Sequence, residues 1–221
     1  MSEYVEQLAM CVERGKVNKD SPYPPDLKGF DGADELAQQA LENGLKPDII
    51  LKGCIIGMDR IGTKFSENKV FVPELLMAAK AMTAAMEHLK PFFQSGEVKR
   101  KGTFVIGTVA GDLHDIGKNL VAMVVEGGGF EVIDLGNDVS THKFLAAIEE
   151  HPGCIVGMSA LLTTTMVNME GTIRAIKEKF PNTQVLIGGA PVTQEFADKI
   201  GADGYSSNPQ GAVAILNRKV A

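Results

Sequence analysis

The sequence predicts a helical N-terminal region followed by an α/β domain with a parallel sheet. Two observations carry this prediction. Over roughly the first ninety residues, apolar positions recur at helical spacing and strand-like alternation is absent. From Gly102 onward, short apolar runs alternate with helical stretches, which is typical of βαβ units. With 221 residues, of which 44% are hydrophobic, the chain can supply a core for each part.

Four helices are expected in the first region, where they form a small bundle. The clearest follows Pro73, because its apolar residues advance by three or four positions along one face until Pro91 stops the helix. That face comprises Leu75, Ala79, Met82, Met86 and Leu89. The other three helices are expected from about Glu3 to Arg14, Asp34 to Glu42 and Pro47 to Ile61. Residues 20–31 are rich in proline and are expected to form an extended loop.

Five apolar runs in the second region predict a flavodoxin-like (Rossmann-like) five-stranded parallel sheet. The strands are expected at 103–108, 131–134, 154–158, 184–187 and 203–205, with helices at 118–126, 141–150, 167–180, 194–200 and 210–217. A break at residues 94–101 divides the chain into a helical domain, 1–94, and an α/β domain, 102–221. In such sheets a ligand lies beyond the carboxyl ends of the strands, so the loops there are the informative ones.

Composition and charge exclude several classes of function. The net charge is -6, and basic residues cluster only at Lys99 to Lys101, so nucleic acid is not expected as a partner. No apolar run approaches the roughly 18 residues that span a bilayer, and the N-terminus does not resemble a signal peptide, so a cytoplasmic location without a membrane partner is expected. The three cysteines, Cys11, Cys54 and Cys154, are far apart and suit buried, reduced thiols.

The loop after the first expected strand contains Asp112, His114 and Gly117. Side chains two positions apart in an extended loop project to the same side, so Asp112 can bind one imidazole nitrogen and leave the other as a metal ligand. Gly117 allows a sharp turn and close approach by something bulky. The alternative is an ordinary loop histidine paired with Asp112 or Asp115. A zinc site is poorly supported because no further cysteine or histidine lies at ligand spacing.

Two further loops follow the third and fourth expected strands. Residues 159–165 form a hydroxyl-rich loop with two leucines, which suggests the lining of a pocket; the alternative is a helix N-cap built from threonines. Gly188 and Gly189 remove side chains where a bulky group could rest on the backbone, although a glycine pair alone indicates only a turn.

Together these loops resemble the cobalamin-binding domain family, with D-x-H-x-x-G, then S-x-L about forty-five residues later, then G-G. The resemblance implies that cobalamin is the cofactor and that His114 is the lower axial ligand of its cobalt. It makes Asp112 and Gly117 part of the first motif, and Leu161 part of the second. It implies that Ser159 and Thr163 bind around the buried nucleotide base, and that Gly188 and Gly189 leave room for the nucleotide tail. Thr165 stands where methionine synthase has the serine of its ligand triad.

The helical region extends the resemblance. Residues 65–74 look like the segment that covers the upper cobalt face in methyl-carrying relatives, with Phe65 and Val72 at the apolar positions. Val72 replaces the leucine of methionine synthase, and it also fits an ordinary place in the bundle core. Phe65 is the stronger candidate of the two.

The whole arrangement resembles the small corrinoid proteins of anaerobic methyltransferase systems. It implies a methyl carrier, charged as methylcobalamin, that is not catalytic alone. Its partners would be a donor-specific methyltransferase, an acceptor methyltransferase and a reductive activation protein. The alternatives are a cobalamin-dependent sensor or storage module and a small mutase subunit. The sequence leaves the methyl donor open among methylamines, methanol, betaines and aryl methyl ethers.

Overall fold

The structure, a computed structural model, describes residues 3–220 and divides into two compact units at Arg100 and Lys101, with Gly127–Gly129 grouped with the first. The domain bounds expected from the sequence, 1–94 and 102–221, stay predictions. None of the helices within residues 3–220 combines the length and apolar character that crossing a bilayer requires.

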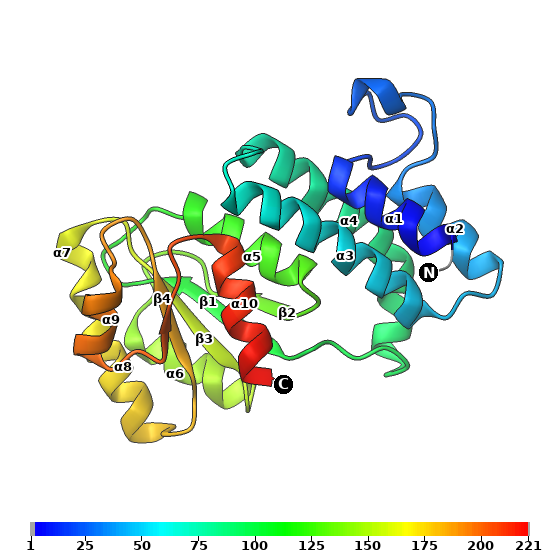
Figure 1. Ribbon diagram of the computed structural model, residues 1–221. Helices are drawn as coiled ribbons and strands as arrows, with labels where there is room; N and C mark the ends of the chain where they lie inside the picture. The colour runs from blue at the N-terminus through cyan, green and yellow to red at the C-terminus, as the bar shows by residue number, and fades with distance from the viewer. Residues whose placement is uncertain (1–2, 221) are drawn as a thin grey trace. The chain divides into compact units, whose positions relative to one another are not determined.

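The first unit is the expected bundle of four α-helices (Figure 1). The third helix continues past Ile61 to Ser66, and the fourth begins just before Pro73 instead of after it. The expected loop at residues 20–31 holds one short turn of 3-10 helix, η1, at Pro25–Leu27. The α-helices are α1 (Glu3–Arg14), α2 (Ala33–Glu42), α3 (Pro47–Ser66) and α4 (Val72–Gln94).

The bundle core contains the apolar residues that the helical spacing singled out. Each helix contributes a buried stripe, which includes Leu8 and Val12 of α1, Ile50 and Met58 of α3, and Leu75, Met82 and Leu89 of α4. Helices α1 and α3 approach closely at Gly57, where a Cβ atom would lie 2.6 Å from the carbonyl oxygen of Ala9. A glycine is therefore required there by packing.

Pro91 does not stop the last helix of the bundle, so that expectation was wrong. Pro91 lies inside α4, in the last turn before Gln94. A proline in a helix frees the carbonyl four residues earlier, which here belongs to Glu87. Both Glu87 and Pro91 are exposed, so water can satisfy that carbonyl and the cost of the proline is small.

The second unit holds the expected five-stranded, all-parallel sheet, with strand order β2-β1-β3-β4-β5. This is the flavodoxin-like order, in which the chain reverses direction across the sheet between β1 and β3. The expected fold class is therefore confirmed. The third and fourth strands begin and end one residue later than the apolar runs suggested. The strands are β1 (Thr103–Thr108), β2 (Glu131–Asp134), β3 (Ile155–Ser159), β4 (Val185–Gly188) and β5 (Gly204–Tyr205).

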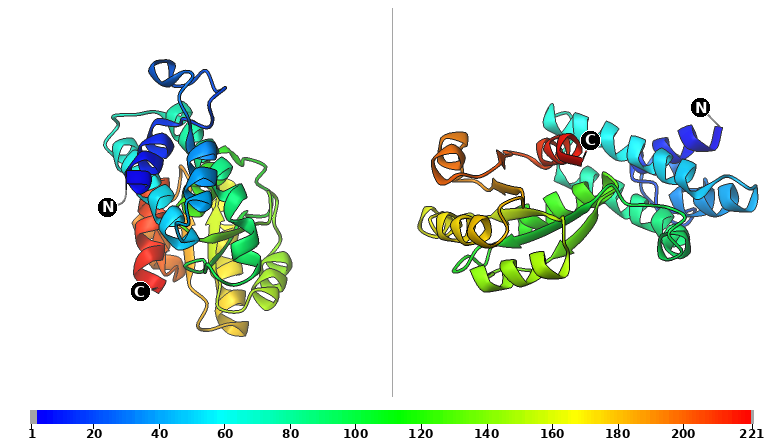
Figure 2. Two further views of the ribbon diagram at one scale, coloured as in Figure 1. Left: turned by 90° about the vertical axis from the view of Figure 1, so that its right-hand side faces the viewer. Right: turned by 90° about the horizontal axis from the view of Figure 1, so that it is seen from below.

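Helices cover both faces of the sheet (Figure 2). Residues of α6, α8 and α9 share one core with alternate residues of β1, β3 and β4, while α5 and α10 lie on the opposite face. A short additional helix, α7, occupies part of the hydroxyl-rich segment that we expected to be a loop. The helices are α5 (Ile116–Gly127), α6 (Thr141–Glu150), α7 (Thr163–Met166), α8 (Asn168–Lys179), α9 (Gln194–Ile200) and α10 (Pro209–Val220).

Candidate functional site

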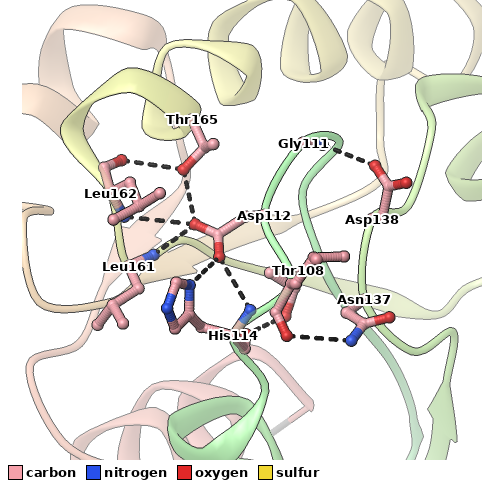
Figure 3. Close-up of polar contacts among 10 residues, drawn as sticks. Thr108, Gly111, Asp112, His114, Asn137, Asp138, Leu161, Leu162 and Thr165 are labelled. Carbon is pink, nitrogen blue, oxygen red and sulfur yellow. Dashed lines mark hydrogen bonds and ion pairs between the residues drawn. The ribbon is translucent and has the colours of Figure 1, made fainter.

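The carboxyl ends of β1 and β3 bring together the two loops in which the sequence placed its strongest candidates. The buried carboxylate of Asp112 joins these loops (Figure 3). Its Oδ1 atom accepts from His114 Nδ1 at 2.9 Å and from the His114 backbone N–H at 3.1 Å. Its Oδ2 atom accepts from the backbone N–H groups of Leu161 at 2.8 Å and Leu162 at 3.3 Å, and from Thr165 Oγ1 at 2.6 Å.

These contacts fix the charge of Asp112. Burial would raise the pKa of its carboxyl, but hydrogen bonds from Thr165, Leu161 and His114 outweigh burial and hold the pKa well below its ordinary value. An ionised carboxylate only accepts hydrogen bonds, so Nδ1 of His114 must carry the hydrogen it shares with Asp112. In a neutral ring, Nε2 then keeps its lone pair.

The His114 side chain is suited to present that lone pair outward. It is 52% exposed, whereas the Asp112 side chain is 0% exposed. The sequence predicted the pairing with Asp112, and the 2.9 Å contact confirms it. An ordinary loop histidine would make the same pair, so the pair alone does not distinguish a ligand.

The structure gives the orientation of Thr165, which the sequence left open. Its side chain is buried in α7 and its hydroxyl points at Asp112. Leu162 occupies the N-cap position of α7 without a side-chain cap bond. The alternative of an N-cap built from threonines is therefore wrong, because the threonines lie inside the first turn. Thr163, the first residue of α7, is exposed.

The glycines differ in what their missing side chains would meet. A Cβ atom at Gly189, where φ is +126°, would lie 1.9 Å from the carbonyl oxygen of Ala160, and one at Gly188 would lie 3.0 Å from that of Ser206. The protein's own packing thus explains this pair. Gly117 is the reverse case: it lies inside α5, so the expected sharp turn is wrong, and nothing lies within 4 Å of its Cβ position. It leaves open space.

Several residues that hydrogen-bond to the histidine loop, residues 109–115 between β1 and α5, were not identified from the sequence. The buried Thr108 donates to the His114 carbonyl at 3.0 Å, and Asn168 donates to the Ala110 carbonyl at 2.8 Å. Asn137 and Asp138, which follow β2, also bind the loop. The only signal for the last two was the turn-forming sequence Gly136-Asn137-Asp138.

Apolar side chains are exposed around His114. Leu113 is 69% exposed and Ile116 is 81% exposed, and the two leucines that bind Asp112 through their backbones, Leu161 and Leu162, are exposed as well. Grouped exposed apolar residues indicate a binding surface, not a random surface position.

The two cap candidates lie in the first unit. Phe65, in the last turn of α3, is partly buried, and Val72, the first residue of α4, is 39% exposed. The exposure of Val72 does not fit the alternative that it is an ordinary residue of the bundle core.

Comparison with known proteins decides the family. Residues 102–214 match the family described as "B12 binding domain", and residues 30–90 match a second family with the same description. The chain belongs to the B12-binding domain family. Its cofactor is accordingly a corrinoid of the cobalamin type.

Relatives of this B12-binding protein cover most of its length. A trimethylamine corrinoid protein from Methanosarcina mazei is 43% identical over 82% of this chain and 86% of the relative. A dimethylamine corrinoid protein from Methanosarcina acetivorans is 45% identical over 76% and 80% of the two chains.

Solved structures also resemble this B12-binding chain. A cobalamin-binding protein from Desulfitobacterium hafniense has a TM-score of 0.77 at 30% identity, with 98% of each chain covered. A methanol:cobalamin methyltransferase complex from Methanosarcina barkeri has a TM-score of 0.81 at 28% identity, with 99% of this chain and 80% of the other covered. The expected two-part fold is the one that these structures share.

The residues present at the candidate site fit such a cofactor. The open space at Gly117 and the exposed side chains of Leu113 and Ile116 suit a broad, largely apolar ring. His114 offers one imidazole nitrogen. Within residues 3–220 there is no cluster of three or more histidine, cysteine or acidic residues that could hold a metal ion. A single protein ligand suits a metal whose other positions are filled by a macrocycle.

Proposed function

We propose that this protein carries a methyl group on cobalamin between a donor-specific methyltransferase and an acceptor methyltransferase. The bound cofactor supplies the cobalt atom that accepts and releases the methyl group. The chain supplies the lower axial ligand, His114, and does not catalyse the transfer alone. The observation that carries the proposal is the His114 ring, whose Nδ1 is held by the buried Asp112 carboxylate while the side chain is 52% exposed.

Each neighbouring residue has a proposed part in holding the cofactor. Asp112 keeps the imidazole in the tautomer that can bind a metal through Nε2, and Thr165 keeps Asp112 ionised. The remaining proposed positions follow the family motif. Gly117 and Leu161 border the corrin, and the nucleotide tail lies near Ser159, Thr163, Gly188 and Gly189. Phe65 and Val72 cover the upper cobalt face.

The names of the relatives support a methyl-carrying role. The trimethylamine and dimethylamine corrinoid proteins favour a methylamine as the class of methyl donor. The methanol:cobalamin methyltransferase complex supports a methyltransferase as the direct partner. A reductive activation protein is a further proposed partner, because a corrinoid that carries methyl groups must be returned to its reduced state after accidental oxidation.

The ligand role is tested by magnetic resonance. The full-length protein is produced with ordinary and with ¹⁵N-labelled histidine and reconstituted with cob(II)alamin. If a histidine nitrogen binds cobalt, the superhyperfine splitting changes from triplets to doublets on labelling. His114→Ala is expected to abolish that change, whereas His142→Ala, an exposed histidine in α6, is expected to leave it intact.

The carrier role needs a separate measurement. The reconstituted protein is first reduced to the cob(I)alamin form with a chemical reductant such as titanium(III) citrate. It is then mixed with purified trimethylamine, dimethylamine or methanol methyltransferase and the matching methyl donor, and formation of methylcobalamin is followed by absorbance. We expect methylation with at least one methylamine enzyme. A protein that binds cobalamin through His114 but is methylated by none of these enzymes, and by no betaine or aryl methyl ether methyltransferase, is a sensor or storage protein or a mutase subunit instead.

A further inference from the structure

A segment outside the family motif, residues 136–139 after β2, holds the histidine loop along most of its length (Figure 3). The Asp138 carboxylate accepts from the Gly111 backbone N–H at 2.7 Å. The Asp138 backbone N–H donates to the Asp112 carbonyl at 3.0 Å. The Asn137 side chain donates to the Leu113 carbonyl at 3.1 Å. Three consecutive residues that lead directly to His114 are thus bound by two neighbours from another loop.

The segment is itself anchored, so it can act as a fixed support. The Thr108 N–H donates to the Gly136 carbonyl at 3.0 Å, and the Val139 N–H donates to the Thr108 carbonyl at 2.9 Å. Val109 and Val139 form an isolated parallel bridge just beyond the end of β1. These bonds extend the pairing of the sheet to the point where the histidine loop begins.

The backbone of Asp138 points to the same role. Its φ is +50°, in the left-handed region. That conformation is unfavourable for an L-residue, although aspartate tolerates it better than most residues. Asp138 is exposed and gains nothing from burial. Its two hydrogen bonds to the histidine loop are the interactions that offset this cost.

We propose that Asp138, assisted by Asn137, is a positioning residue that fixes the Gly111–His114 backbone so that His114 meets the cobalt. This proposal rests on the proposed ligand role of His114. The Asp112 side chain orients the ring, and Asp138 holds the main chain from which that ring extends. Loss of the Asp138 carboxylate therefore shifts the bound corrinoid from the histidine-ligated toward the histidine-free form.

Three substitutions separate the carboxylate from the backbone conformation. Asp138→Gly keeps the left-handed backbone at no steric cost but removes the acceptor. Asp138→Asn keeps an oxygen acceptor and a residue type that tolerates positive φ. Asp138→Ala removes both. Cob(II)alamin-loaded full-length protein with ¹⁵N-labelled histidine reports the histidine-ligated fraction directly. We expect a shift of about threefold to tenfold toward the free form in the glycine and alanine variants, the size of one hydrogen bond, and none in the asparagine variant.

Each outcome has a defined meaning. An unchanged fraction in Asp138→Gly, or a loss confined to Asp138→Ala, overturns the role of the carboxylate. If wild-type protein shows no histidine coupling, the proposed ligand role fails and this inference falls with it, whereas coupling in wild type with an unchanged fraction in Asp138→Gly overturns this inference alone. Asn137→Asp removes the donor to Leu113 and is expected to shift the fraction in the same direction, which gives a second route if Asp138→Gly folds poorly. Asn182→Gly, in the exposed turn before β4, is the matched control and is expected to change nothing.

Discussion

At the scale of single residues, the Asp112 carboxylate governs the charge state of the site. Its hydrogen-bond donors come from its own loop and from residues 161–165, nearly fifty positions further along the chain. The chain spacing of Asp112 and His114 was enough to predict their contact. No local pattern could reveal the backbone donors of Leu161 and Leu162, because they come close only after β1 and β3 pair.

Thr165→Val tests how strongly this carboxylate depends on its side-chain donor. The substitution keeps the shape but removes a hydrogen bond to a buried charge, so the free energy of unfolding should fall by about 1.5–3 kcal/mol near neutral pH. Urea unfolding of the cofactor-free protein measures it. Thr164→Val, at an exposed position, is the control and should change stability little.

The pH dependence of that loss follows from the lowered pKa of Asp112. A depressed folded-state pKa contributes stability that is present above the unfolded pKa, about 3.9, and is lost as pH falls toward the folded value. The Thr165→Val variant has less of this stability to lose. The difference in unfolding free energy between variant and wild type should therefore be constant between about pH 5 and 7 and should become smaller below about pH 4. A gap that widened in acid would contradict this account.

Gly189→Ala tests the packing role of the glycine pair. The new Cβ atom would meet the Ala160 carbonyl, a backbone atom that cannot move aside, in a conformation unfavourable for alanine. We expect a loss of about 2 kcal/mol or more in unfolding free energy even without cofactor. Gly171→Ala, inside α8 with nothing within 4 Å, should instead stabilise by about 0.5–1 kcal/mol. If Gly189→Ala weakened only cobalamin binding, the missing side chain would serve the ligand and not the packing.

At the scale of elements, Lys118 ties the start of α5 to the end of β2. Its side chain is 1% exposed, and its ammonium group pairs with the Asp134 carboxylate and with the Asn119 side chain. Asp134 is 39% exposed. The two partners are therefore unequal, because only the carboxylate can be solvated when the pair is broken.

The unequal exposure of Lys118 and Asp134 predicts which of two substitutions costs more stability. Asp134→Ala leaves a buried ammonium group with one partner fewer and should cost about 1–3 kcal/mol. Lys118→Met fills the same space and leaves only a carboxylate that water reaches, so it should cost less. Thermal unfolding of both proteins gives the comparison. Equal losses would mean that the buried ammonium group is no costlier to leave unpaired than the exposed carboxylate.

The sequence predicted the elements better than their ends. Every expected helix and strand is present, because hydrophobic spacing reports burial and burial defines the elements. The apolar runs placed β3 and β4 one residue early. Before β3 the cause is Cys154, which is buried and therefore looks like part of the strand, whereas Gln184 before β4 is only partly buried. The prediction that Pro91 ends α4 was wrong because the cost of a proline in a helix depends on whether water reaches the freed carbonyl and on how close the proline lies to the helix end. The short helix α7 gave no periodic signal because it is only four residues long.

At the scale of the whole molecule, we expect the thiols of the three cysteines to react slowly in the folded protein. All three are free and buried. Burial raises the pKa of the Cys11 and Cys154 thiols to about 11 and that of Cys54 to about 12. Since the thiolate is the reactive form, an aromatic disulfide reagent near pH 8 should react slowly with native protein and with all three thiols in guanidinium. Rapid reaction without denaturant would contradict the burial of these residues.

The boundary between the two domains is a second property of the whole molecule that can be tested. The two units divide between Arg100 and Lys101, and we propose that residues 94–101 form the boundary between domains 1–94 and 102–221. Limited trypsin digestion should cut first at Lys99, Arg100 or Lys101 and yield two resistant fragments, identified by mass spectrometry. First cuts within α3 or within the sheet would place the boundary elsewhere.

The shared use of one acid by two loops has a mechanical result. Because Asp112 holds the backbone of Leu161 and the hydroxyl of Thr165 as well as the ring of His114, neither loop can be displaced alone without breaking a charged hydrogen bond. A displacement of the His114 ring therefore strains the hydrogen bond between Asp112 and Thr165 of α7, and a displacement of α7 strains the hydrogen bond between Asp112 and the ring. The two loops and the His114 ring thus respond to a displacement as one unit.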